Sequence, residues 1–105
     1  MKNRTKSFLL LLIFSLTNDL FAITWTLQNS GTTQNLWDVF FTDSSNGFAC
    51  GDSGTLVKTT DGNSWTNVPT GVTSTLMKIH FPNSAIGYVA GSDNATLLKT
   101  SDGGV

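Results

Sequence analysis

Short stretches of alternating apolar and polar residues, separated by turn residues, run through the chain from residue 36 onward. In residues 36–41, Val39 and Phe41 fall on one face of an extended strand, and Asp38 and Phe40 fall on the other. Alternation with a period of two is typical of a half-buried β-strand. Runs of β-branched residues and turns rich in Asn, Asp and Gly follow. The pattern predicts four short strands before a turn that contains Pro and Gly.

The same pattern returns about forty residues later. The repeated stretches are 36–41 with 76–81, 47–51 with 87–91, and 55–62 with 96–103. A fixed period of this size indicates an array of supersecondary units. Four antiparallel strands in each unit of roughly 40 residues are typical of a β-propeller blade. We therefore predict an all-β chain of propeller blades that form an incomplete ring.

The repeat predicts how the chain is divided. Residues 36–75 form a first blade, and residues 76–105 form a second blade that lacks its last strand. Residues 23–35 contain Thr-Trp-Thr at the position of Ser-Trp-Thr in the first blade, so they are predicted to be a strand that closes the last blade of a ring. Propellers have about four to eight blades. We therefore expect this sequence to be the N-terminal piece of a longer protein.

Residues 1–22 have the features of a secretory signal peptide. Three basic residues precede the apolar run 8–16, and Ala22 offers a small residue for cleavage. A membrane anchor is the alternative, but the run has about half of the roughly 20 residues that cross a bilayer. We expect the segment to be removed. The mature chain would be secreted, periplasmic or at the cell surface, without a stable membrane span.

The composition of the mature chain excludes several classes of function. From Ile23 onward it has three lysines, six aspartates, no arginine and no glutamate, and its formal net charge is −3. The lack of a basic face argues against nucleic-acid binding. The one cysteine, Cys50, aligns with Ala90 and is predicted to fill the core. The one histidine, His80, aligns with Phe40 and is predicted to be a surface or packing residue. We expect no metal and no cofactor.

The turn after the third predicted strand, Thr59-Thr-Asp-Gly-Asn-Ser-Trp65, resembles the Asp-box of bacterial neuraminidase repeats, although it is one residue shorter. The longer pattern, from Trp25 to Val105, is similar to the repeats of the photosystem II stability/assembly factor family. This resemblance implies a β-propeller. The positions that correspond to the box are Thr59, Asp61, Gly62 and Trp65 in the first repeat, and Thr100, Asp102 and Gly103 in the second.

We interpret the box residues as structural. A short Asp side chain can accept hydrogen bonds from turn N–H groups, Gly adopts a positive φ, and Trp packs under the hairpin. A catalytic or metal-binding role is the alternative. However, Asp61 and Asp102 lie on equivalent turns one blade apart, so they cannot act as a carboxylate pair.

These observations predict an exported, non-catalytic scaffold that binds a protein or a surface glycan. One alternative is a sialidase-like glycoside hydrolase whose active site lies outside this stretch, because the mature chain has no arginine and its only tyrosine, Tyr88, lies within a repeat strand. The family resemblance implies another alternative, an assembly factor for a membrane protein complex. Trp37, which aligns with Met77, is either an exposed anchor for a partner or a packing residue between blades.

Overall fold

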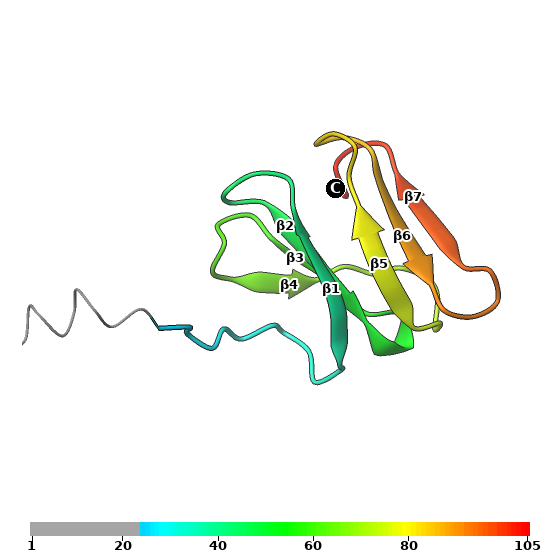
Figure 1. Cartoon of the computed structure of the whole chain (residues 1–105), viewed down its shortest axis with the longest axis horizontal. Helices are drawn as coiled ribbons and strands as arrows, with labels where there is room; N and C mark the ends of the chain where they lie inside the picture. The colour runs from blue at the N-terminus through cyan, green and yellow to red at the C-terminus, as the bar shows by residue number, and fades with distance from the viewer. Residues whose placement is uncertain (1–23) are drawn as a thin grey trace, which may run out of the picture.

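The computed structural model describes residues 24–105, which form seven strands and one short 3₁₀-helix (Figure 1). The predicted signal peptide, residues 1–22, lies outside the described residues. None of the described residues forms a helix that could cross a membrane. The elements are β1 (Leu36–Phe41), β2 (Gly47–Gly51), η1 (Asp52–Gly54), β3 (Leu56–Thr59), β4 (Trp65–Asn67), β5 (Leu76–His80), β6 (Gly87–Gly91) and β7 (Leu97–Thr100).

The strands form two antiparallel sheets that follow the order of the chain. The first sheet has the order β1-β2-β3-β4, and the second has the order β5-β6-β7. Each first strand has the same irregularity in its register, between Leu36 and Asp38 and between Leu76 and Lys78. The predicted fold class is therefore confirmed: the chain is all-β, and its repeat unit is a small antiparallel sheet.

The core lies between the two sheets, because β5 packs against β1 and β2 (Figure 1). The rings of Phe48 and Phe81 are stacked there, with centroids 5.0 Å apart. Cys50 is completely buried, as predicted, and its thiol donates a hydrogen bond of 3.4 Å to the carbonyl of Leu76. Burial raises the pKa of this thiol to about 11. The Asp38 carboxylate joins the sheets directly, because it accepts the N–H of Ile79 at 2.8 Å.

Equivalent apolar residues of the two sheets differ in burial. Ile79 and Phe81 are 5% and 7% exposed, whereas their counterparts Val39 and Phe41 are 55% and 42% exposed. The second sheet presents this face to the first sheet. The same face of the first sheet has no other sheet over it among residues 24–105. The alternation of apolar and polar residues is the same in both repeats, but only the second sheet packs this face against another sheet.

The N-terminal strand that we predicted within residues 23–35 does not form in this structure. Residues 24–35 have no strand conformation, and the Trp25 side chain is 100% exposed. The physical reason is that no strand lies beside this segment to share its backbone hydrogen bonds. Its role in closing a last blade stays a prediction.

Candidate binding surface at the turn end of the sheets

The first predicted Asp-box turn follows β3, and one oxygen of its carboxylate accepts hydrogen bonds from within the turn. Asp61 Oδ1 accepts the N–H groups of Asn63 and Ser64, each at 2.8 Å, and the Thr59 hydroxyl at 3.0 Å. Gly62 has a φ of +76°, which favours glycine. The hydrogen bonds from the Ser64 and Asn63 backbone, and then from Thr59, lower the pKa of Asp61 to about 2.

The second turn follows β7 and has the same design. The Thr100 hydroxyl donates to Asp102 Oδ1 at 2.7 Å, and the Val105 N–H donates to the same oxygen at 3.3 Å. Gly103 has a φ of +74°. The Thr100 hydrogen bond is the main cause that lowers the pKa of Asp102. Each aspartate therefore lies in its own sheet and serves its own turn, and the two are not brought together.

Trp65 and His80 occupy packing positions. The Trp65 ring meets Phe41 edge-on, with centroids 5.9 Å apart, and its Nε1 donates to Gln28 Oε1 at 2.8 Å. His80 is exposed on β5, and its ring meets Phe40 edge-on at 5.6 Å. Within residues 24–105, no group of three or more His, Cys, Asp or Glu side chains could hold a metal ion.

The end of the sheets opposite the two Asp-box turns carries a different set of side chains. We call it the turn end, and it consists of η1, the β6–β7 turn at residues 92–96, and the connection 68–75. These segments are joined by hydrogen bonds, such as Gly54 N–H to the Ser74 carbonyl at 2.8 Å and Ser92 N–H to the Thr75 carbonyl at 2.9 Å. The turn end is therefore one continuous surface across both sheets.

The Trp37 side chain comes from β1 and is bonded to η1 of the turn end. It is 53% exposed, and its Nε1 donates to Asp52 Oδ1 at 2.7 Å. The same carboxylate accepts Asn35 Nδ2 at 3.1 Å and Thr75 Oγ1 at 3.4 Å. The sequence indicates Trp37 as a candidate anchor, but it does not indicate Asp52 as the partner of Trp37. The pairing of β1 with β2 brings the two residues together, because it sets Leu36 opposite Gly51, one residue before Asp52.

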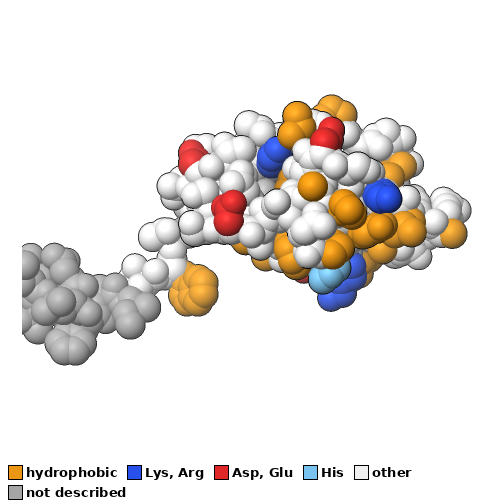
Figure 2. Space-filling model, turned by 90° about the horizontal axis from the view of Figure 1, so that it is seen from above, with side chains coloured by type: hydrophobic (Ala, Val, Ile, Leu, Met, Phe, Trp, Pro, Cys, Tyr) orange, Lys and Arg blue, Asp and Glu red, His pale blue; other side chains and the backbone are white. Residues whose placement is uncertain are grey.

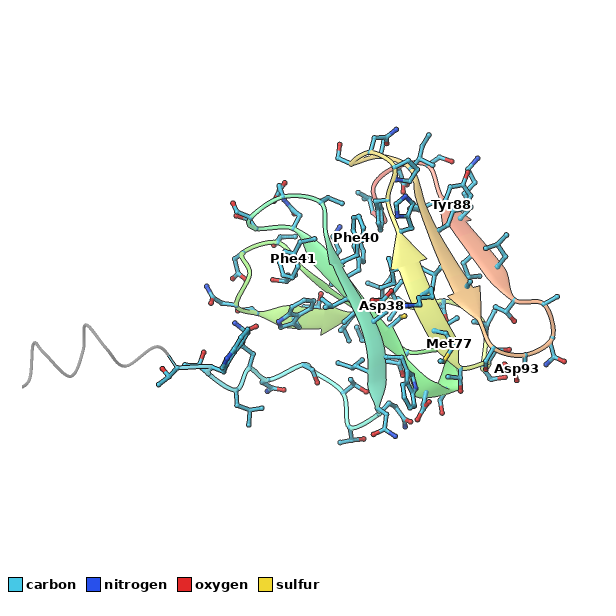
Figure 3. All side chains as sticks on the ribbon, viewed as in Figure 1. Asp38, Phe40, Phe41, Met77, Tyr88 and Asp93 are labelled. Carbon is cyan, nitrogen blue, oxygen red and sulfur yellow. The ribbon has the colours of Figure 1, made fainter. Side chains whose placement is uncertain are left out.

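Met77 and Asp93 occupy the corresponding place in the second sheet (Figure 3). Met77 aligns with Trp37. The Asp93 carbonyl accepts the N–H of Thr96, as the Asp52 carbonyl accepts the N–H of Thr55. Beside Trp37, a shallow hollow of about 460 Å³ lies over the uncovered face of the first sheet, where Val39 and Trp65 also line it. The Trp37 indole, the Asp52 carboxylate and the apolar hollow therefore lie together at one edge of the molecule.

Comparison with known proteins identifies the architecture. No protein-family model matches the chain, and no curated protein matches it. The solved structure of YCF48 bound to a D1 peptide resembles it with a TM-score of 0.67 and 25% sequence identity, over 79% of this chain. The repeats are photosystem II assembly factor-like β-propeller repeats. This chain spans 28% of the length of the YCF48 chain.

The two sheets are therefore propeller blades. In a propeller, the turn end of each blade lies at one end of the ring. The first strand of each blade continues from the connection that follows the fourth strand of the blade before it, as β5 follows β4. This connection and the turn between the second and third strands lie at the same end of the blade. In a propeller, the ends of the ring carry the turns between strands, and such turns are where a rigid scaffold presents binding residues.

Proposed function

We propose that this chain is part of an exported, non-catalytic β-propeller that serves as a scaffold for a partner protein and binds an extended segment of it at the turn end. The observation that carries the proposal is the similarity of the blades to YCF48, a propeller whose solved structure contains a bound peptide. The export part rests on the signal-like residues 1–22.

The chemistry of the turn end supports peptide binding. A half-exposed indole is a common anchor of protein interfaces. Because Asp52 already holds the Trp37 ring, the side chain loses little conformational freedom when a partner packs on it. Asp52 and Asp93 make the surface acidic, and no Lys or Arg lies in η1 or in residues 92–96. The proposed partner segment is therefore polar or basic, with an apolar residue that contacts Trp37.

The same observations support a scaffold over an enzyme. Asp61 and Asp102 are engaged by turn hydrogen bonds, and His80 packs on Phe40 and bonds to no carboxylate within residues 24–105. A partner that is a subunit of a membrane protein complex would make the chain part of an assembly factor, in keeping with the family resemblance. A surface glycan would use the same indole, because sugars also pack on exposed aromatic rings.

An array of peptides tests the proposal. The array contains the D1 peptide and overlapping peptides from exported and membrane proteins of the host, and it is probed with the folded protein. We expect binding of a polar or basic peptide, and loss of about 30-fold in affinity, or about 2 kcal/mol, in Trp37→Ala. His80→Ala, a change at an exposed residue away from the turn end, is the matched control and should bind normally.

Two results would overturn this proposal. Binding that is unchanged in Trp37→Ala would move the site away from the turn end. Binding to a parallel glycan array but to no peptide would replace the protein partner with a carbohydrate.

A further inference from the structure

The first strand of each blade carries one extra residue, which is Trp37 in β1 and Met77 in β5. In β1 the register passes from Leu36 directly to Asp38, so Trp37 has no partner on β2, and β5 repeats this step at Met77. A bulge of this kind bends the strand and re-aims the side chain. Met77 keeps part of its surface exposed although its sheet packs on the first sheet, whereas Ile79 is 5% exposed. The bulge by itself therefore keeps this position open to solvent.

The carboxylate beside Trp37 has different partners from that of an Asp-box turn. Within residues 24–105 it accepts only side-chain donors, which are Trp37 Nε1 at 2.7 Å, Asn35 Nδ2 at 3.1 Å and Thr75 Oγ1 at 3.4 Å. The Asp61 carboxylate instead accepts two backbone N–H groups of its own turn. Seen from the end that carries the Asp-box turns, the acidic side chains lie apart from one another, as expected where each serves one turn (Figure 2). The Asp52 side chain therefore holds neighbouring side chains, and it does not cap η1.

The second blade has the same backbone at this place but a different pair of side chains. Ser92 N–H donates to the Thr75 carbonyl at 2.9 Å. In the first blade, Asp52 N–H donates to the Asn35 carbonyl at 3.0 Å. By this bond Ser92 occupies the place of Asp52, and the residue in the bulge is Met77. Met has no N–H donor in its side chain and Ser has no carboxylate. Because the second blade forms without the donor and without the acceptor, the fold of a blade does not require the pair.

The bond to Asp52 determines what Trp37 offers to a partner. An indole has a single N–H donor, and Asp52 Oδ1 already accepts it. A partner therefore meets the ring itself, which favours an apolar side chain over a carbonyl or carboxylate group. The negative charge of Asp52 beside the ring also disfavours an acidic segment.

We propose that Asp52 is a positioning residue that holds the Trp37 ring in one orientation, so that, of the two blades, only the first anchors the partner segment. A side chain that is fixed before binding loses less conformational entropy when the partner packs on it. This role rests on the proposed function, since it concerns the same site at the turn end. Asp52 acts through Trp37, and the second blade has the scaffold of the site without its anchor.

NMR signals of the indole N–H groups test the positioning without any partner. The full-length protein is isotope-labelled in its tryptophans, Trp37→Phe identifies the Trp37 signal, and the Trp65 signal reports on the fold. We expect Asp52→Ala to speed hydrogen exchange of the Trp37 N–H by about tenfold. Asp52→Asn keeps an oxygen acceptor and should restore most of the protection. Asp93→Ala is the matched control and should change nothing, because within residues 24–105 the Asp93 carboxylate bonds only to the Ser92 hydroxyl. Unchanged exchange in folded Asp52→Ala would overturn the proposal.

The second blade provides a test that leaves Asp52 in place. Met77→Trp adds an indole at the bulge, and Met77→Trp combined with Ser92→Asp adds its acceptor as well. We expect slow exchange of the new indole N–H only in the double variant. Should Asp52→Ala fail to fold, this comparison decides the question, and equal exchange in the single and double variants would show that the carboxylate does not hold the indole.

Affinity for a peptide selected from the array then shows how Asp52 acts on binding. Asp52→Ala should weaken binding by about two- to tenfold. The same change in a Trp37→Ala background should have no further effect, because Asp52 acts through the ring. Trp37→Phe keeps a ring face but lacks the N–H, and it should bind more tightly than Trp37→Ala.

The outcomes separate this proposal from the proposed function. A further loss from Asp52→Ala in the Trp37→Ala background, or equal binding by Trp37→Phe and Trp37→Ala, would mean that the carboxylate or the N–H contacts the partner directly, and the positioning role would be wrong. If no peptide binds while the exchange results are as expected, the proposed function fails and the positioning of Trp37 by Asp52 is confirmed.

Discussion

At the scale of single residues, the three tryptophans have three different environments. Trp65 packs on Phe41 and bonds to Gln28, Trp37 is half exposed, and Trp25 has no packing partner. We expect Trp65→Ala to lower the free energy of unfolding by about 2 kcal/mol, which is less than the loss for a fully buried ring because Trp65 is only partly buried. Trp37→Ala should lower the free energy of unfolding by a smaller amount. Urea unfolding of both variants measures the difference, and an equal or larger loss at Trp37 would contradict this assignment.

The lowered pKa of Asp61 leads to a prediction about how the stability of the fold depends on pH. Its pKa is about 2 in the folded chain against an ordinary value of 3.8, so the charged form is favoured by folding. The stabilisation is present above pH 3.8 and is lost as the pH falls towards 2. We expect Asp61→Asn to be less stable than wild type at neutral pH. As the pH falls from 3.8 towards 2, the variant should lose less stability than wild type does. Denaturant midpoints at several pH values measure this loss.

Asp93→Asn provides the matched control for this pH dependence. The Asp93 carboxylate accepts the Ser92 hydroxyl at 3.4 Å, and no backbone N–H donates to it in the structure. Its substitution should leave the acid dependence of wild type in place. If Asp61→Asn and wild type lose stability in parallel as the pH falls, the Asp61 hydrogen bonds do not stabilise the turn.

At the scale of elements, equivalent glycines at the start of β2 and β6 test the packing between blades. A Cβ at Gly87 would overlap the ring of Phe81, and a Cβ at Gly47 would overlap the ring of Phe41. Phe81 is held in the core by its stack on Phe48, whereas Phe41 is 42% exposed and can move. We expect Gly87→Ala to cost about 1–3 kcal/mol and Gly47→Ala clearly less. Thermal or urea unfolding separates them, and equal losses would mean that the core between the blades adapts freely.

At the scale of the whole molecule, two blades leave two surfaces to be covered. The first blade exposes Val39 and Phe41, and the second exposes the edge of β7. Small β-domains have marginal cores, and open edges promote association. We expect residues 23–105 expressed alone not to form a stable monomer. Light scattering after gel filtration gives the mass, and a monodisperse monomer with cooperative thermal unfolding would refute the prediction.

The sequence by itself determined the local features of this protein. Alternation with a period of two, the spacing of turn residues and the repeat near forty residues predicted the strands, and the resulting all-β fold class is confirmed. The alignment of Cys50 with Ala90 predicted a small buried side chain, which the structure contains. These features depend on residues that are close in sequence or on comparison of the two repeats. For that reason they can be read without knowledge of which sheets meet.

Only the tertiary structure decided which faces are covered and which side chains meet at the turn end. Val39 and Ile79 have the same place in the same pattern, yet one is exposed and the other buried, because burial depends on the neighbouring sheet. The bond from Trp37 to Asp52 requires the register of β1 on β2 and the irregularity at Leu36, and neither follows from periodicity. Residues 24–35 contain a strand-like sequence but form no strand, because a strand needs a partner for its backbone hydrogen bonds.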